Sequence, residues 1–310
     1  MRKHISRFIF LQLVAVLAVA LVPAPSAAAA DLPESPDGTI KAIYQKLADR
    51  HPEIIWQALP ASYQQDITDV TRAFAGKMDP EIWNSLFGLA NKTVDILRDK
   101  KQYILESSFM DAAGDEKVRI EQNWDTVVAI LDDLFSSEIS DLEKLETIDW
   151  EELLKTTGAE IMDSAQNLST AKSAEEKDKD LTTLLRQSKI ETISHEGNTA
   201  TVLVSTPGEE PEDISLTLVE GRWVPTDMAQ DWDTKIAEAK EKIATMSEEE
   251  MAQNKMQAMM MFGMADGMLG ELAQVSSKEE FEQAIQGILG PMMGMGGDVM
   301  MDMEMTGEDE

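Results

Sequence analysis

The chain has 310 residues, and 58 acidic against 27 basic side chains give it a formal net charge of −31, with no cysteine anywhere. The absence of cysteine excludes disulfides, catalytic thiols, thiolate metal sites and attachment of a lipid through a cysteine. So acidic a surface repels phosphates, and we expect neither a nucleic-acid partner nor an anionic lipid partner. The acids are scattered, which favours solubility over a cation- or basic-protein-binding role as the reason for the charge.

The first thirty residues have the pattern of a cleavable signal peptide. Arg2, Lys3 and Arg7 precede an apolar run over residues 8–22, and small residues follow up to Ala30. The run is shorter than the roughly 20 apolar residues of a spanning helix, and an A-x-A-like site comes after it. We expect cleavage after Ala30, a secreted or periplasmic location and no membrane attachment afterwards. The remaining chain then has 24 basic and 58 acidic residues, a charge of 24 − 58 = −34.

Helical periodicity dominates the chain from Asp31 to residue 188. Apolar residues Ile40, Ile43 and Leu47 recur at i, i+3 and i+7, as on one face of an amphipathic helix. Asp79-Pro80 is typical of an N-cap followed by proline at the first helical position. We expect one domain over residues 31–246, with a helical insertion near 79–172.

The one convincing β segment covers residues 189–225. Gly197-Asn198 and Glu220-Gly221 are two-residue turn signals between runs that alternate at period two. These runs predict three to four antiparallel strands. The fold class is therefore α+β, a mostly helical body with a small antiparallel sheet.

Pairing across the two turns gives the expected register of the strands. It places Ile193 opposite Val202, His195 opposite Ala200, and Leu218 opposite Trp223. A sheet this small is stable only with one face covered. We expect the helices from Thr39 onward to cover the face that carries Ile193, Val202, Leu218 and Trp223.

The carboxyl-terminal part is rich in methionine. Ser247 with Glu250 and Ser277 with Glu280 are capping-box patterns, which predict a Met-rich helical hairpin over residues 247–291. The Gly- and acid-rich residues 292–310 predict a disordered acidic tail. Fourteen of the twenty methionines follow residue 250: Met251, Met256, Met259, Met260, Met261, Met264, Met268, Met292, Met293, Met295, Met300, Met301, Met303 and Met305.

Three interpretations of these methionines remain open. They fill an irregular core or mediate self-association, they form an adaptable apolar surface for a protein partner, or their thioethers bind Cu(I). Met256, Met260, Met264 and Met268 share a helix face at i, i+4 spacing. Gly263, Gly267 and Gly270 permit close approach of another helix, which favours docking of this helix against one.

Two stretches carry a resemblance to a known superfamily. One is a helix pair near the amino terminus, TIKAIYQKLADRHPEIIWQALP. The other is in the β segment, where the strand TATVLV is followed by the hairpin ISLTLVEGRWVP. Together they are similar to secreted members of the nuclear-transport-factor-like, or cystatin-like cone, superfamily. The general style also looks like that of uncharacterised secreted bacterial proteins. The resemblance implies a curved sheet wrapped around an amino-terminal helix, here with a large helical insertion, and it implies a fold more than a function.

A cone fold would place a pocket between the sheet and its helices. The residues expected to face it are Tyr44, Trp56, Glu191, His195 and Trp223, with Glu191 on the strand face of Ile193. A histidine with a carboxylate is able to act as a general acid–base pair. The simpler interpretation is that the aromatic residues are core and that the histidine and the glutamate are solvated.

No catalytic set, metal cluster or cofactor motif is present in the sequence. We therefore expect an exported non-catalytic module that binds a protein partner, through the Met-rich carboxyl-terminal helix, or a small ligand. The alternatives are a small-molecule enzyme that uses the pocket, and a soft-metal binder that uses the Met-rich segment.

Overall fold

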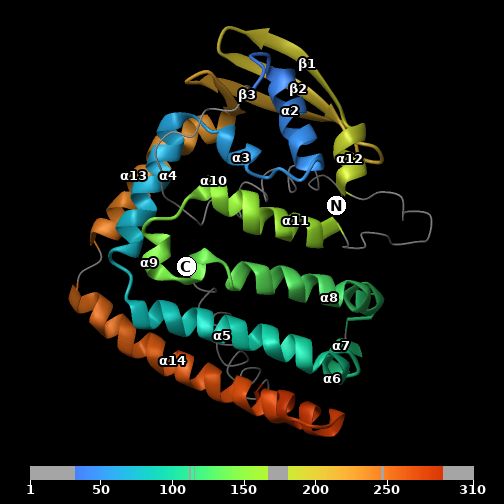
Figure 1. Cartoon of the computed structure of the whole chain (residues 1–310), viewed down its shortest axis with the longest axis vertical. Coiled ribbons are helices and arrows are strands. Elements are labelled where there is room, and N and C mark those ends of the chain that lie inside the picture. The colour runs from blue at the N-terminus through green and yellow to red at the C-terminus, as the bar shows by residue number, and fades with distance from the viewer. Residues whose placement is uncertain (1–31, 112, 115, 167–180, 246–247, 289–310) are drawn as a thin grey trace, which may run out of the picture.

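The computed structural model describes residues 32–111, 113–114, 116–166, 181–245 and 248–288. It is an α+β fold in which a four-stranded antiparallel sheet lies at one end of a mostly helical body (Figure 1). The predicted signal peptide and the predicted disordered tail lie outside the described residues. Among the helices that the structure describes, none combines the length and the apolarity that a membrane-spanning segment requires.

The sheet follows the chain in simple order. Strands β1 (Lys189–Glu196), β2 (Thr199–Ser205), β3 (Glu212–Val219) and β4 (Arg222–Pro225) are neighbours in the order β1-β2-β3-β4. Both predicted turns are confirmed. Gly197 has a φ of 59°, and Glu220 and Gly221 have φ values of 50° and 78°. Two successive positive φ angles, as at Glu220 and Gly221, are what a type I′ turn requires, whereas at the first turn only Gly197 has a positive φ.

The register confirms two of the three expected pairs. His195 lies opposite Ala200, and Leu218 opposite Trp223. The pairing of Ile193 with Val202 is wrong, because Thr192 takes that place and the register shifts between Thr192 and Ser194. An extra residue in one strand is a β-bulge, which is left unpaired. Ile193 is this residue, and it is 52 % exposed.

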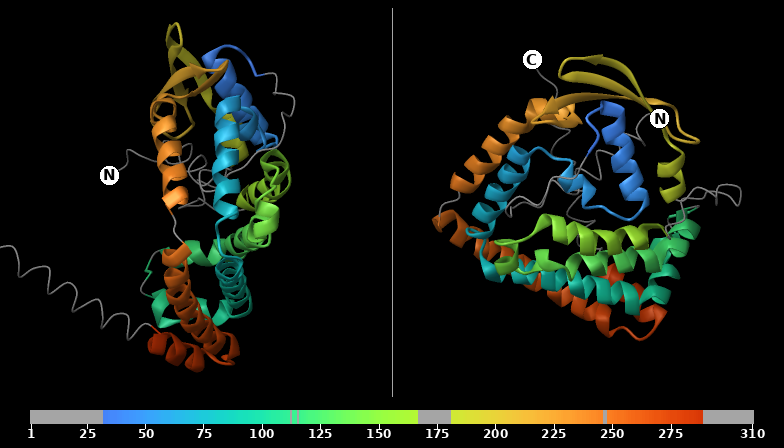
Figure 2. Two further views of the ribbon diagram at one scale, coloured as in Figure 1. Left: turned by 90° about the vertical axis from the view of Figure 1, so that its left-hand side faces the viewer. Right: turned by 45° about the horizontal axis from the view of Figure 1, so that its top comes forward.

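Helix α2 (Pro36–Ala48) covers one face of the sheet (Figure 2). Its Ser35 N-cap accepts a hydrogen bond from the Gly38 N–H at 3.2 Å. The expectation that helices cover the face of Val202, Leu218 and Trp223 is confirmed, and its extension to Ile193 is wrong. The core between helix and sheet contains buried residues from both and from the segment that follows α2: Ile40, Ile43, Leu47, Ile54, Ala58, Ile190, Ala200, Val202, Val204, Leu216 and Trp223.

Short helices α3 (Ile54–Gln57) and α12 (Leu181–Gln187) lie beside α2, and two longer helices connect the sheet to the rest of the body. Helices α4 (Ala61–Ala75) and α13 (Thr226–Thr245) pack together through Tyr63 and Trp232, whose rings are stacked with centroids 3.8 Å apart. The Trp232 indole N–H donates to Asp66, which also pairs with Lys240 at 2.8 Å. This aromatic and ionic contact joins α13 to α4.

The remaining helices lie in succession below the sheet (Figure 1). They are α5 (Pro80–Asp99), α6 (Lys101–Leu105), α7 (Ser108–Asp111), α8 (Glu116–Phe135), a 3₁₀ turn (Glu138–Ser140), α9 (Leu142–Leu145), α10 (Trp150–Leu153), a π-helical turn (Leu154–Gly158) and α11 (Ala159–Gln166). The start of α5 is as predicted, because the Asp79 carboxylate accepts hydrogen bonds from the N–H groups of Glu81 and Ile82. A second cluster, which includes Trp56 and Trp150, joins this part to α3 and α4.

The Met-rich helix α14 (Glu248–Gln274) packs alongside α5 and runs in the same direction. At the amino-terminal ends of the two helices, Lys255 of α14 pairs with Asp79, which precedes α5. At the carboxyl-terminal ends, Lys100 after α5 donates to the carbonyl of Val275 after α14. A further helix covers residues 278–288. One half of its predicted capping box is present, because Ser277 Oγ accepts from the Glu280 N–H. The Glu280 carboxylate instead accepts from the N–H of Ser276, one residue before the cap.

Candidate interaction surface

The structure brings together two of the five residues expected around a pocket at the sheet. His195 and Trp223 are in edge-to-face contact with ring centroids 5.3 Å apart. Trp223 is buried, and its indole N–H donates to the Glu34 carbonyl at 2.7 Å. The bulge at Ile193 accounts for this contact, because one extra residue moves the following side chains of β1 to the other face of the strand. His195 therefore shares the face of Ala200 and Trp223, at its exposed edge.

The other three residues lie apart from one another. Tyr44 packs against the core cluster of α2 and the sheet, where burial, reinforced by the negative charge of Glu212, raises its pKa to about 12. Trp56, a residue of α3, belongs instead to the second cluster, with Trp150. Glu191 is exposed and lies opposite Leu203 in the sheet.

The histidine and the glutamate do not form an acid–base pair. Cross-strand partners share a face of a sheet, and side chains alternate between the two faces along a strand. Leu203 and Ala200 are three positions apart in β2 and therefore lie on opposite faces. Glu191 is opposite Leu203 and His195 is opposite Ala200, so the carboxylate and the imidazole are on opposite faces. Within the described ranges, no three His, Asp or Glu side chains gather as ligands of a metal ion would.

An exposed apolar surface lies on α14 instead. Met256, Met260, Met261 and Met264 are 60–69 % exposed, and we call these four residues the methionine surface. The predicted stripe continues to Met268, which is partly covered. Of the neighbouring methionines, Met259 faces α5, where the Ser85 hydroxyl lies 3.8 Å from its sulfur. Large apolar side chains gathered in one exposed patch indicate an interaction site more strongly than scattered ones do.

The charge distribution sets this helix apart from the rest of the chain. Residues 251–265 contain no acidic side chain and a single basic one, Lys255, whereas acids make up 58 of 310 residues overall. Depletion of charge together with enrichment in methionine is the composition of interface cores. This signal is readable in the sequence, once acidic residues are counted in windows along the chain.

Two of the three glycines of α14 do not serve its contact with α5. A Cβ atom added at Gly263 or Gly267 would meet no atom within 4 Å, and one added at Gly270 would meet only Lys92 Nζ at 3.6 Å. The expectation of docking against another helix holds for α14 as a whole, since it packs on α5. The two open glycines leave its backbone accessible next to the methionine surface.

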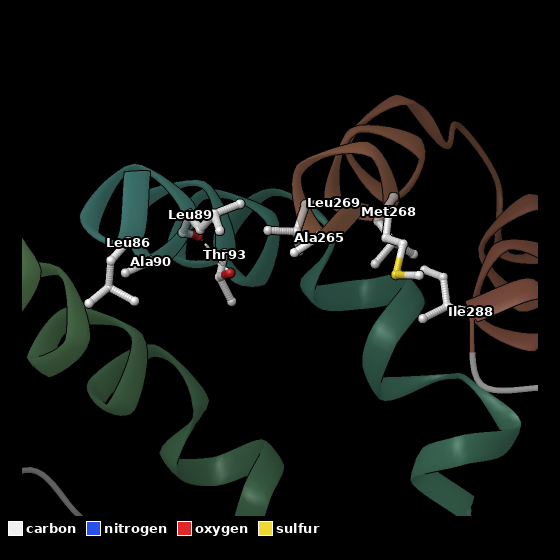
Figure 3. A pocket seen from close by; sticks show the side chains of 9 residues that line it. Leu86, Leu89, Ala90, Thr93, Ala265, Met268, Leu269 and Ile288 are labelled. Carbon is white, nitrogen blue, oxygen red and sulfur yellow. Dashed lines mark hydrogen bonds between the residues drawn. The ribbon is translucent and has the colours of Figure 1, made fainter. Parts of the chain in front are cut away.

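A groove adjoins the methionine surface, between α5 and the carboxyl-terminal half of α14 (Figure 3). It has a volume of about 410 Å³. Its lining consists of Leu86, Leu89, Ala90 and Thr93 of α5, Ala265, Met268, Leu269 and Leu272 of α14, and Ile288. Each helix contributes positions i, i+3, i+4 and i+7, which form one face. We call this feature the α5–α14 groove.

The groove is almost wholly apolar. Its one polar side chain, Thr93, donates its hydroxyl proton to the Leu89 carbonyl within α5 and leaves no donor for a ligand. Leu86 is 44 % exposed, and of the twenty residues of α5 only Val94 and Ile96 are buried. Met264 and Met268 are one helical turn apart, so the groove and the methionine surface are continuous.

Comparisons with protein-family models, with curated proteins and with solved structures found no match. The resemblance to the cystatin-like cone superfamily therefore stays a prediction.

Proposed function

We propose that this chain is an exported, non-catalytic module that binds a protein partner through the methionine surface of α14. The observation that carries the proposal is the exposure of Met256, Met260, Met261 and Met264 on a helix that is already docked on α5. Methionine side chains are flexible and polarizable, and they adapt to apolar partners of differing shape. The signal-peptide pattern of residues 1–30 supports export.

The charge of the chain indicates the chemistry of the partner. An uncharged apolar surface on a chain of net charge −31 favours a segment whose apolar face is flanked by lysine or arginine. An amphipathic helix that lays its apolar face on such a surface is a recurring mode of recognition. We therefore propose a basic amphipathic helix as the segment that binds.

A pair of designed peptides tests this proposal. A helical peptide with a leucine face and a lysine face should bind the chain from Asp31 to Glu310 saturably, and the same peptide with glutamate in place of lysine should not. The substitutions Met260→Glu and Met264→Glu together should weaken binding of the lysine peptide by roughly tenfold or more, because two charges would be desolvated in the interface. Fluorescence anisotropy of labelled peptides measures both affinities.

The matched control is the double substitution Val118→Glu with Val127→Glu, which places the same two charges at apolar positions of α8 that are 59 % and 44 % exposed. It should leave the affinity unchanged. Unchanged or increased affinity in both variants, as nonspecific attraction between opposite charges would give, would refute the proposed surface.

Soft-metal binding is the second candidate, and one observation favours it. Met256, Met260 and Met264 succeed one another at i, i+4 and i+8 on the exposed face, so their thioethers line one side of the helix. Thioethers are soft ligands that suit Cu(I). The expected result is competition for Cu(I) with a chromogenic chelator under reducing conditions, lost when all three residues are changed to leucine. Unchanged competition after that substitution would exclude this helix as the site.

A further inference from the structure

The α5–α14 groove is an apolar surface for which the described residues provide no cover. Leu86, Leu89 and Ala90 of α5 face it from one side, and Ala265, Met268 and Leu269 of α14 from the other (Figure 3). Exposed apolar area of this kind is stabilised when another apolar segment removes it from water.

The course of the chain indicates the occupant. Ile288, at the end of the last described helix, is itself part of the groove lining, beside Met268. From there 310 − 288 = 22 residues remain. Pro291 has no backbone N–H and disfavours helical geometry at the residue before it, so the sequence does not favour continuation of the helix beyond this point. A segment attached at this point has an effective concentration in the millimolar range.

The composition of the remaining residues matches the groove. Residues 289–297, LGPMMGMGG, contain no charge and include Met292, Met293 and Met295. All acids of the segment come later, from Asp298 onward. The part of the segment that directly follows Ile288 in the sequence is therefore uncharged, and the acidic residues come only after it.

The length of the uncharged part is also sufficient. Nine extended residues span up to about 30 Å. The stretch of α5 from Leu86 to Thr93 rises only about 10 Å at 1.5 Å per residue. Residues 289–297 are thus long enough to run from Ile288 along the whole groove.

We propose that residues 289–297 bind in the α5–α14 groove of their own chain, with the methionines covering Leu86, Leu89 and Ala90. Because the groove is continuous with the methionine surface, the bound segment borders the site proposed for the partner helix. The proposal concerns a contact within the chain and does not depend on the identity of that partner.

The absence of cysteine makes a disulfide test direct. The pair Ala90→Cys with Met295→Cys places one thiol in the groove and one on the segment. The control pair, Gly88→Cys with Met295→Cys, places the first thiol two residues earlier on α5, at an exposed position where an added Cβ meets no atom within 4 Å. Under oxidised glutathione at micromolar protein, the groove pair should close an intramolecular disulfide about tenfold faster than the control pair, by the difference in effective concentration. Peptide mapping of the oxidised chain measures both rates.

Two outcomes would overturn the proposal. Equal rates would mean that the segment does not prefer the groove, and disulfides formed only between chains would assign the groove to a second copy. A measurement without cysteines guards against misfolding of the variants. Met295→Glu should increase binding of an apolar fluorescent dye several-fold by releasing the segment, whereas Thr306→Glu, beyond the methionines, should not. Equal dye binding by Met295→Glu and the unaltered chain would also refute the contact.

Discussion

The Glu220 carboxylate, in the turn between β3 and β4, accepts a hydrogen bond from the backbone N–H of Ser62 at 3.0 Å. Ser62 lies in the first turn of α4, where N–H groups have no partner within the helix. The residue before α4 is Pro60, which makes no side-chain cap. Glu220 therefore caps from the sheet a helix 158 residues away in the sequence.

The first prediction concerns this cap. Hydrogen bonds from Ser62, first its backbone N–H and then its hydroxyl, lower the pKa of Glu220. A lowered pKa in the folded state stabilises the fold above the pKa of the unfolded chain, and this contribution is lost as pH falls through the folded pKa. Glu220→Ala should reduce the free energy of unfolding at pH 7 by about 0.5–1 kcal/mol, the lower range for a cap because Glu220 is exposed. Urea unfolding at pH 7 and pH 3 measures the difference between the two chains, which should shrink at pH 3.

The control is Glu220→Gln, which keeps an acceptor for Ser62 but no titrating group. It should lose less stability than Glu220→Ala at pH 7. Equal losses in the two variants would show that the charge, and not the hydrogen bond, provides the stabilisation.

The second prediction concerns the bulge in β1. Leu216 is fully buried in the sheet core, whereas Ile193 is 52 % exposed. Leu216→Ala should lower the free energy of unfolding by roughly 2–5 kcal/mol through the cavity it leaves. Ile193→Ala should change it by less than about 0.5 kcal/mol, as for other surface positions. A large effect of Ile193→Ala in urea unfolding would contradict the observed register.

The third prediction is a pH dependence set by Tyr44. Its pKa of about 12 in the folded chain lies above the value of 10 for a free tyrosine. The neutral ring is thus favoured in the folded state, so this contribution to stability is complete below pH 10 and is lost as pH rises to about 12. Tyr44→Phe should flatten that part of the stability profile. The difference in ultraviolet absorbance between the two chains during alkaline titration should place the Tyr44 transition near pH 12, and a transition near pH 10 would contradict it.

The fourth prediction separates two roles of Asp79. Its carboxylate caps α5 and pairs with Lys255 of α14 at 2.9 Å, and the hydrogen bond from Lys255 is the main cause of its lowered pKa. Asp79→Asn keeps a capping oxygen and removes the charge. It should therefore lower the free energy of unfolding only by the contribution of an exposed ion pair, up to about 1 kcal/mol. Asp79→Ala removes both and should cost about 1 kcal/mol more. Thermal unfolding of both variants compares them, and equal loss would mean that the cap contributes nothing.

Much of the sheet could be predicted from local sequence. The turns at Gly197-Asn198 and Glu220-Gly221 are specified by residues that accept positive φ, and period-two alternation then gave the pairs of His195 and Leu218. The bulge was not predicted in this way, because counting back from the turn in constant register places the apolar Ile193 opposite Val202. The sign of it in the sequence is that Ile190 and Ile193 are three residues apart, so a regular strand cannot place both on one face. In the structure Thr192 takes the place opposite Val202, and its hydroxyl donates to Asp37 of α2 at 3.1 Å.

The arrangement of the helices was less accessible. The starts of α5 and of the helix over residues 278–288 followed from their capping residues. The packing of α14 on α5 depends on contacts between residues far apart in the sequence, such as the ion pair of Lys92 with Asp266. A local sequence pattern does not predict such contacts. Helical spacing places Met256, Met260, Met264 and Met268 on one face. Which way this face points depends on the packing of α14 against α5, so its exposure was not predicted. The groove was missed because it needs stripes from two helices.

The parallel packing of α5 and α14 has a consequence for how the chain reaches its folded state. Lys92 and Asp266 are 174 residues apart, whereas each pair of neighbouring strands in the sheet is joined by a short connection. Contacts between distant residues form slowly, since a long loop must close before they contribute. During synthesis the strands can pair soon after they emerge from the ribosome, while the apolar stripe of α5 must wait for α14, whose Asp266 follows Lys92 by 174 residues. Premature termination before Glu248 would therefore leave a paired sheet beside an α5 stripe without its neighbour, a form that chaperones and proteases recognise.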